Sequence, residues 1–233
     1  MSRQAHRFCF PRQGVLFLLS APSGTGKTTL AQRLLDRVSG LSVSVSYTTR
    51  PPRPGEVDGR AYHFVSEAEF ARLRRAQAFV EWAEVHGALY GTAHAVLDAA
   101  VSRGRDLLLE IDVQGARHIK NRYPQAVAIF LLPPSWQELE RRLRSRATDS
   151  AQTIARRLTR GRQEARQLAW YDYCVVNERL DEAEADLVAI IRTERARIAR
   201  FTQSATLQSL LGPQPDRSST APPLASPDGH EQP

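Results

Sequence analysis

Cysteine and long apolar runs are what this chain of 233 residues has least of. Its two cysteines, Cys9 and Cys174, lie far apart, which indicates no disulfide framework and fits a reducing compartment, the cytoplasm. No apolar run approaches the roughly 20 residues of a membrane-spanning helix. Residues 1–7 contain no apolar segment of signal-peptide length. We therefore expect a cytoplasmic protein with no membrane partner.

Lysine is also scarce, and the charge of the chain comes from arginine. Lys27 and Lys120 are the only lysines, whereas the net charge is +7. A basic balance suits anionic partners, either nucleotides or nucleic acid. Because no basic patch is interleaved with aromatic residues in the way that single-strand binders require, we expect nucleotides and no nucleic acid. A hydrophobic content of 42% is enough for a buried core.

The strongest motif follows an apolar run at residues 15–19. It consists of Ala21, Pro22, Ser23, Gly24, Thr25, Gly26, Lys27 and Thr28. A strand, a glycine-rich turn and Gly-Lys-Thr at the start of a helical pattern predict a P-loop, with Ala21 where the motif has its first glycine. Glycines let consecutive N–H groups face a phosphate. Lys27 would then reach the β/γ-phosphates, and the hydroxyl of Thr28 would bind Mg²⁺.

A basic loop follows a strand pattern at residues 42–49. Its prolines fix φ and hold Arg50 and Arg53, whose planar guanidinium groups suit phosphate, although a solvated basic loop would have the same composition. Further strands are expected at residues 61–65 and 78–85, with a capped helix beginning at Ser66 between them. Residues 42–92 would form a small inserted region, where a kinase would hold its acceptor.

The second half of the chain predicts a metal-binding strand and a lid. The strand pattern at residues 105–112 ends in Glu110 and Asp112, and carboxylates there indicate a Walker-B-type element that holds Mg²⁺ through water. Which of the two serves the metal is left open. Arginine-rich helical patterns on both sides of residues 147–150 predict a lid that closes over the triphosphate.

These patterns together predict an α/β fold. Its P-loop NTPase-type parallel sheet would be flanked by helices and carry a small inserted α+β region for the acceptor and a helical arginine-rich lid. The expected boundaries are a leader at 1–13, a domain at 14–200 and a disordered Pro/Ser-rich tail at 201–233. Within the domain, the core would be 14–41 and 93–200, the insertion 42–92 and the lid about 144–158.

Taken in order, five stretches resemble the guanylate kinase family. They are residues 20–28, 44–56, 79–92, 109–115 and 171–177, and the resemblance extends from about 15 to 200. It implies an ATP:GMP phosphotransferase of purine metabolism, which transfers the γ-phosphoryl of Mg-ATP to GMP or dGMP, and it identifies the inserted α+β region as GMP-binding. Mg²⁺ would be the cofactor, and the oligomeric state is not predicted.

The resemblance also assigns roles residue by residue. ATP would be bound by residues 21–28 and, near the adenine, by Asn177. The phosphate of GMP would be bound by Arg50, Arg53, Tyr62 and Tyr90, and the guanine by Ser46, Glu81 and Thr92, with Asp112 beside the acceptor. The transferring phosphates would be contacted by Lys27, Arg142, Arg146 and Arg157. The metal would be held by Thr28 and, through water, by Glu110.

The chemistry of guanine agrees with the role of Glu81. Guanine presents N–H donors on its N1 and N2 edge and adenine does not, so a buried carboxylate can select guanine by about 10⁴ or more. Two alternatives are open. One is a catalytically inactive guanylate-kinase-like binding module, and the other is a related P-loop kinase for a phosphorylated sugar. The intact Gly26-Lys27-Thr28 argues against the first, and Tyr62, Glu81 and Thr92 together argue against the second.

Overall fold

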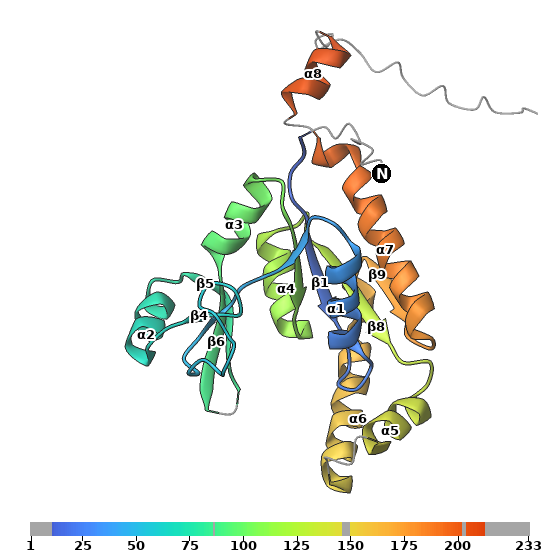
Figure 1. Cartoon of the computed structure of the whole chain (residues 1–233). Coiled ribbons are helices and arrows are strands. Elements are labelled where there is room, and N and C mark those ends of the chain that lie inside the picture. Colours follow the sequence, from blue (N-terminus) through green and yellow to red (C-terminus); the bar gives the residue numbers. More distant parts are fainter. Residues whose placement is uncertain (1–10, 86, 146–149, 202–203, 213–233) are drawn as a thin grey trace, which may run out of the picture.

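The computed structural model describes residues 11–85, 87–145, 150–201 and 204–212. Its strands are β1 (Leu16–Ser20), β2 (Leu41–Val43), β3 (Tyr47–Thr48), β4 (His63–Phe64), β5 (Phe79–Val85), β6 (Ala88–Ala93), β7 (Asp106–Glu110), β8 (Val127–Leu132) and β9 (Tyr173–Val176). Its α-helices are α1 (Lys27–Arg37), α2 (Glu67–Arg75), α3 (His94–Ser102), α4 (Val113–Arg122), α5 (Trp136–Ser145), α6 (Ala151–Ala165), α7 (Leu180–Ala196) and α8 (Ala205–Leu211). Two sheets organise these elements, and the smaller one lies to the side of the main body (Figure 1).

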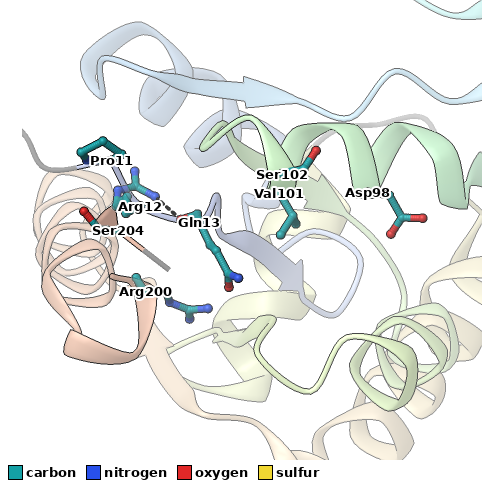
Figure 2. Close-up of a pocket in the computed structure, with 8 residues that line it drawn as sticks. All are labelled: Pro11, Arg12, Gln13, Asp98, Val101, Ser102, Arg200 and Ser204. Atoms are coloured by element: carbon teal, nitrogen blue, oxygen red, sulfur yellow. Dashed lines mark hydrogen bonds between the residues drawn. The ribbon is translucent and has the colours of Figure 1, made fainter. Parts of the chain in front are cut away.

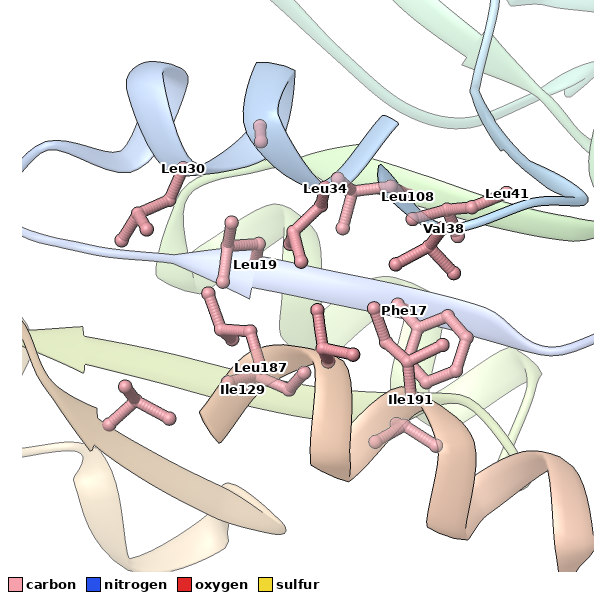
Figure 3. Close-up of a cluster of buried hydrophobic side chains, with 14 of the residues drawn as sticks. Phe17, Leu19, Leu30, Leu34, Val38, Leu41, Leu108, Ile129, Leu187 and Ile191 are labelled. Atoms are coloured by element: carbon pink, nitrogen blue, oxygen red, sulfur yellow. The ribbon is translucent and has the colours of Figure 1, made fainter. Parts of the chain in front are cut away.

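The larger sheet is fully parallel, in the order β2-β7-β1-β8-β9. Its central strand β1 is buried along its whole length, as expected for a parallel strand covered on both faces. Alternate side chains of β1 enter two cores. Phe17 and Leu19 pack toward α1 and α7 (Figure 3), and Leu16 and Leu18 pack toward α3 and α4. The predicted P-loop NTPase-type parallel sheet is therefore confirmed.

The smaller sheet has the order β4-β3-β6-β5 and packs α2 through Phe70, Phe79 and Ala93. The predicted cap of α2 is present, because Ser66 Oγ accepts a hydrogen bond from the Glu69 amide at 3.1 Å. The prediction of a single strand at residues 42–49 is wrong in one respect. The segment is divided into β2, which pairs with β7, and β3, which pairs with β4 and β6. The alternating serine and valine pattern predicts extended backbone without specifying its partner.

The start of the described chain is anchored at the base of the parallel sheet, opposite the P-loop end. Both Arg12 Nη atoms donate to the fully buried carboxylate of Asp106, at 2.8 and 2.7 Å, and Arg195 Nε donates to the same carboxylate at 2.6 Å. Beside this cluster is a pocket of about 370 Å³ that Arg12 and Arg200 help to line (Figure 2). The end of the expected leader is therefore ordered by a buried ion cluster.

The chain after α7 also differs from the expected tail. Disorder is predicted from residue 201, but α8 forms within that segment, with the hydroxyl of Ser204 accepting from the Leu207 amide at 3.3 Å. Residues 1–10 and 213–233 lie outside the described part of the chain. Within the described part, no helix combines the length and apolar character needed to cross a membrane.

Candidate active site

The loop between β1 and α1 has the backbone that a P-loop requires. Gly24 and Gly26 have φ values of +93° and +99°, in the left-handed region that side chains disfavour. Side chains also crowd both positions. A Cβ on Gly24 would lie 2.7 Å from Leu143 Cδ2, and one on Gly26 would lie 2.6 Å from Asn177 Nδ2. Glycine is therefore required at both positions by conformation and by space.

Lys27 begins α1 and extends its ammonium group into the site. Its hydrogen bond within the described residues is a long one, from Nζ to the Ile111 carbonyl at 3.5 Å. Burial lowers the pKa of Lys27, and three carboxylates act in the opposite direction. These are Glu110, Asp112 and Glu164. A desolvated ammonium with unused hydrogen-bonding capacity suits a phosphate oxygen.

The carboxyl end of β7 places two acidic residues beside the P-loop. Thr28 Oγ1 donates to Glu110 Oε2 at 2.9 Å, so a hydroxyl and a carboxylate meet here. Asp112 caps α4, since its Oδ1 accepts from the Gly115 amide at 2.9 Å. No group of three or more His, Cys, Asp or Glu residues in the described chain could hold a metal by itself. An ion here would need further oxygen ligands.

A cavity of about 770 Å³ lies between the two sheets, next to these acidic residues. It brings together seven of the predicted site residues, namely Ser46, Tyr62, Glu81, Tyr90, Thr92, Glu110 and Asp112. Thr92 Oγ1 donates to Glu81 Oε1 at 2.6 Å and lies 3.2 Å from Ser46 Oγ. Because the one proton of Thr92 goes to Glu81, the hydroxyl of Ser46 donates to Thr92. Burial raises the pKa of Glu81, and the hydrogen bond from Thr92 opposes this shift.

Neither loop arginine is among the residues that line this cavity, although Arg50 contacts Tyr62, which does line it. Both arginines are held by a carboxylate that sequence reasoning missed. Arg50 Nη2 donates to both oxygens of Glu56, at 2.8 and 2.9 Å, and its guanidinium carbon lies 5.5 Å from the centroid of the Tyr62 ring. The Arg53 amide donates to the same carboxylate at 2.7 Å. The hydrogen bond from Arg50 lowers the pKa of Glu56. The regular spacing of Arg50, Arg53 and Glu56 is a signal that could have identified this interaction.

Helices α5 and α6 place two of the three predicted lid arginines near the P-loop. Arg157 Nη1 donates to Ser23 Oγ at 3.3 Å. Arg142 Nη1 and Nη2 donate to the carbonyls of Asn177 and Glu178, at 3.0 and 3.2 Å. The third, Arg146, lies outside the described residues.

Asn177, at the end of β9, contacts the P-loop. Its Nδ2 donates to the Thr25 carbonyl at 2.6 Å, and its side chain is buried. This bond braces the loop, and a contact with adenine stays a prediction. Sequence reasoning also missed Glu164, whose carboxylate acts on Lys27 from α6. No local signal points to it, because the two residues are far apart in the chain.

Known proteins resemble this chain over most of its length. A family model described as guanylate kinase matches residues 13–194. A guanylate kinase of Syntrophotalea carbinolica is 51% identical over 194 residues, which are 83% of this chain and 92% of that protein. A guanylate kinase of Bordetella pertussis is 50% identical over 200 residues, or 85% and 93% of the two chains.

A solved structure has the same fold. The crystal structure of guanylate kinase from Anaplasma phagocytophilum superposes with a TM-score of 0.66 at 35% sequence identity, covering 87% of this chain and 96% of that one. The matched region includes the P-loop, the cavity between the sheets and helices α5 and α6. The chain therefore belongs to the guanylate kinase family.

Proposed function

We infer that this chain is an ATP:GMP phosphotransferase, which converts ATP and GMP to ADP and GDP. The observation that carries this inference is the hydrogen-bonded chain from Ser46 through Thr92 to Glu81, in a cavity that also reaches Glu110 and Asp112. An acceptor in this cavity lies beside the P-loop, since Glu110 also binds Thr28. The intact P-loop argues against the binding module, and the hydrogen bonds that join Ser46, Thr92 and Glu81 argue against the sugar-phosphate kinase.

Glu81 and its partners would recognise the guanine. The bond from Thr92 occupies Glu81 Oε1 and fixes the orientation of the carboxylate. The remaining acceptor capacity of Glu81 is then available to the N1 and N2 donors of guanine. An adenine base offers neither donor, so a desolvated carboxylate would be left unpaired. The phosphate of GMP would be bound by Arg50, Arg53, Tyr62 and Tyr90, with Arg50 exchanging Glu56 for the phosphate.

The donor nucleotide would be bound by residues 21–28. Backbone amides of the loop would face the phosphates, Lys27 would contact the β/γ-phosphates, and Asn177 would lie near the adenine. In the transfer, an oxygen of the GMP phosphate forms a bond with the γ-phosphorus as the bond from that phosphorus to the β,γ-bridging oxygen breaks. The charge on the moving group would be stabilised by Lys27, Arg142, Arg146 and Arg157, and no side-chain nucleophile is needed.

Magnesium is the cofactor that we propose. The hydroxyl of Thr28 and the carboxylate of Glu110 are hard oxygen donors 2.9 Å apart, which fits an ion that binds few protein groups together with phosphates and water. When bound with ATP, the ion would supply neutralisation of charge on the β- and γ-phosphates. Thr28 would bind it directly, and Glu110 would orient its water ligands. We also propose that the protein acts in the cytoplasm.

A panel of acceptors tests the reaction. ADP release from Mg-ATP is measured with GMP, dGMP, AMP, CMP, UMP or a sugar phosphate. We expect turnover with GMP and dGMP and little with the others. Binding of GMP without turnover would instead support the binding module, and turnover with a sugar phosphate alone would support the second alternative.

A further inference from the structure

A cavity separate from the P-loop lies beside β5, the edge strand of the smaller sheet. We call it the β5 pocket. It measures about 420 Å³, within the range of small-molecule sites. Its lining residues are Arg74, Gln77, Phe79, Trp82, His94 and Arg122. They come from the last turn of α2, from β5, and from the nearer ends of α3 and α4, in the part of the molecule shown at the left of Figure 1.

The ionisable side chains of the β5 pocket are all basic. Arg74 lies in the last turn of α2, Arg122 ends α4 and His94 begins α3, and no carboxylate of the described residues lines the pocket. Neither arginine has a carboxylate partner among the described residues, although Arg72, on the same helix as Arg74, is paired with Glu69 at 2.7 Å. Two guanidinium groups without counter-charges around one cavity favour an anion there, and their planar groups suit a phosphate.

An aromatic surface accompanies this charge. The side chain of Trp82 is 46% exposed, which is unusual for so large an apolar group. The guanidinium carbon of Arg74 lies 4.8 Å from the centroid of the Trp82 ring. An exposed indole is a surface on which a nucleobase can stack. Phosphate-binding groups beside a stacking surface indicate a nucleoside phosphate.

An unpartnered polar atom lies at the same pocket. Among the described residues, His94 Nδ1 is buried without a hydrogen-bond partner. Such atoms are rare in folded proteins, and a ligand can satisfy them. The positive φ of Gln77, +52°, has a local cause, because this residue follows the end of α2, where the Ala78 amide donates to the Leu73 carbonyl.

The pocket shares a wall with the acceptor cavity but has its own binding groups. Phe79 and Trp82 line both cavities, whereas Glu81 lines the acceptor cavity and Arg74 lines the β5 pocket. We propose that the β5 pocket is a second nucleotide site. It binds a nucleoside monophosphate with the phosphate between Arg74 and Arg122 and the base against Trp82. This site goes beyond the proposed function, since neither arginine has a role in the transfer.

The test uses the full-length protein with both substrate sites filled. Mg-ADP and GMP, the latter at a concentration just sufficient to fill the acceptor cavity, form a complex that cannot react, and AMP is then titrated as the probe. The indole N–H signals of the three tryptophans are followed by NMR, with Trp82→Phe identifying the signal of Trp82. We expect AMP to shift that signal saturably. The double variant Arg74→Ala/Arg122→Ala should weaken AMP binding at least tenfold.

Arg75→Ala is the matched control, because Arg75 is an exposed arginine of the same helix and does not line the pocket. It should bind AMP like the unmodified protein. The proposal is overturned if AMP does not shift the Trp82 signal or if the double variant binds AMP normally. GMP turnover is measured in parallel for the double variant and for Arg75→Ala, but not for Trp82→Phe, because Trp82 also lines the acceptor cavity. Turnover should be unchanged, so a failure here is distinguishable from a failure of the proposed function.

Discussion

Replacement of Glu81 by glutamine should separate guanine recognition from folding. The substitution keeps the shape of the side chain and removes its charge. Of the two oxygens of Glu81, one accepts from Thr92 and the other would accept from guanine. In Glu81→Gln, either the Thr92 hydroxyl or a guanine N–H group therefore faces an amide donor.

The magnitude follows from these contacts. A hydrogen bond to a charged group is worth about 1.5–3 kcal/mol, and a buried donor left unpaired costs about 1–3 kcal/mol. A combined loss of about 3–4 kcal/mol lowers kcat/KM for GMP by about 10²- to 10³-fold. The affinity for Mg-ATP should not change, because Glu81 does not line the P-loop.

The thermal stability of Glu81→Gln, unlike its kcat/KM, should not decrease. Burial raises the pKa of Glu81, so the folded protein holds this proton more tightly than the unfolded chain. That contribution to stability is lost as the pH rises through the folded-state pKa. Glutamine carries no charge to desolvate, so at pH 8 Glu81→Gln should melt at the same temperature as the unmodified protein or higher.

The assay is ADP release at varied GMP, together with thermal melting at pH 8. Glu84→Gln is the matched control, since Glu84 is an exposed carboxylate of the same strand that does not line the cavity. It should leave both measurements unchanged. A decrease in kcat/KM of less than tenfold for Glu81→Gln would falsify our account of guanine recognition. A large decrease in melting temperature would show that the carboxylate serves the fold.

Three further predictions concern the P-loop and the base of the sheet. Lys27→Ala should abolish ADP release without a loss of thermal stability, and residual turnover above about 1% would contradict its role. Gly26→Ala should lower the free energy of unfolding by about 1–2 kcal/mol and weaken ATP binding, because its φ is +99° and the new Cβ would meet Asn177; urea unfolding and ATP titration check both. Asp106→Asn leaves Arg12 and Arg195 without their counter-charge and should cost about 3–5 kcal/mol in urea unfolding. The exposed Asp36→Asn is its control, and equal stability of the two would contradict the role of the buried cluster.

Local signals in the sequence predicted much of the fold. The P-loop needs a strand, two glycines with left-handed backbone and a helix, and all of these lie within a few residues of one another. The cap of α2 depends on Ser66 and Glu69, three residues apart. The strand β8 is a continuous apolar run that two prolines follow directly. Each of these features is determined by residues that are close together in the sequence.

Features that depend on distant partners were not predictable in this way. The ion cluster at the base of the sheet joins Arg12 to Asp106 and Arg195, which are separated by many residues in the chain. Charged residues of this kind are abundant in the sequence, and nothing local indicates which of them become buried. The division of residues 42–49 between two sheets has the same cause, since alternation does not identify a strand's neighbours.

The residues of the candidate site also fall into a predicted group and a group that sequence reasoning missed. Seven predicted residues meet in one cavity, and that grouping follows from the order of the motifs in the family. The carboxylates of Glu56 and Glu164, which act on Arg50 and Lys27, were missed. Both belong to the surroundings of a functional side chain, and tertiary packing sets those surroundings.

The fate of the γ-phosphoryl group tests the central claim most directly. The protein is incubated with ATP labelled in the γ-phosphate, Mg²⁺ and GMP, and the products are separated. We predict that the label appears in the β-phosphate of GDP, with little inorganic phosphate, and that omission of GMP leaves the ATP intact. Label found in inorganic phosphate whether or not GMP is present would mean that water is the acceptor, and it would contradict the account.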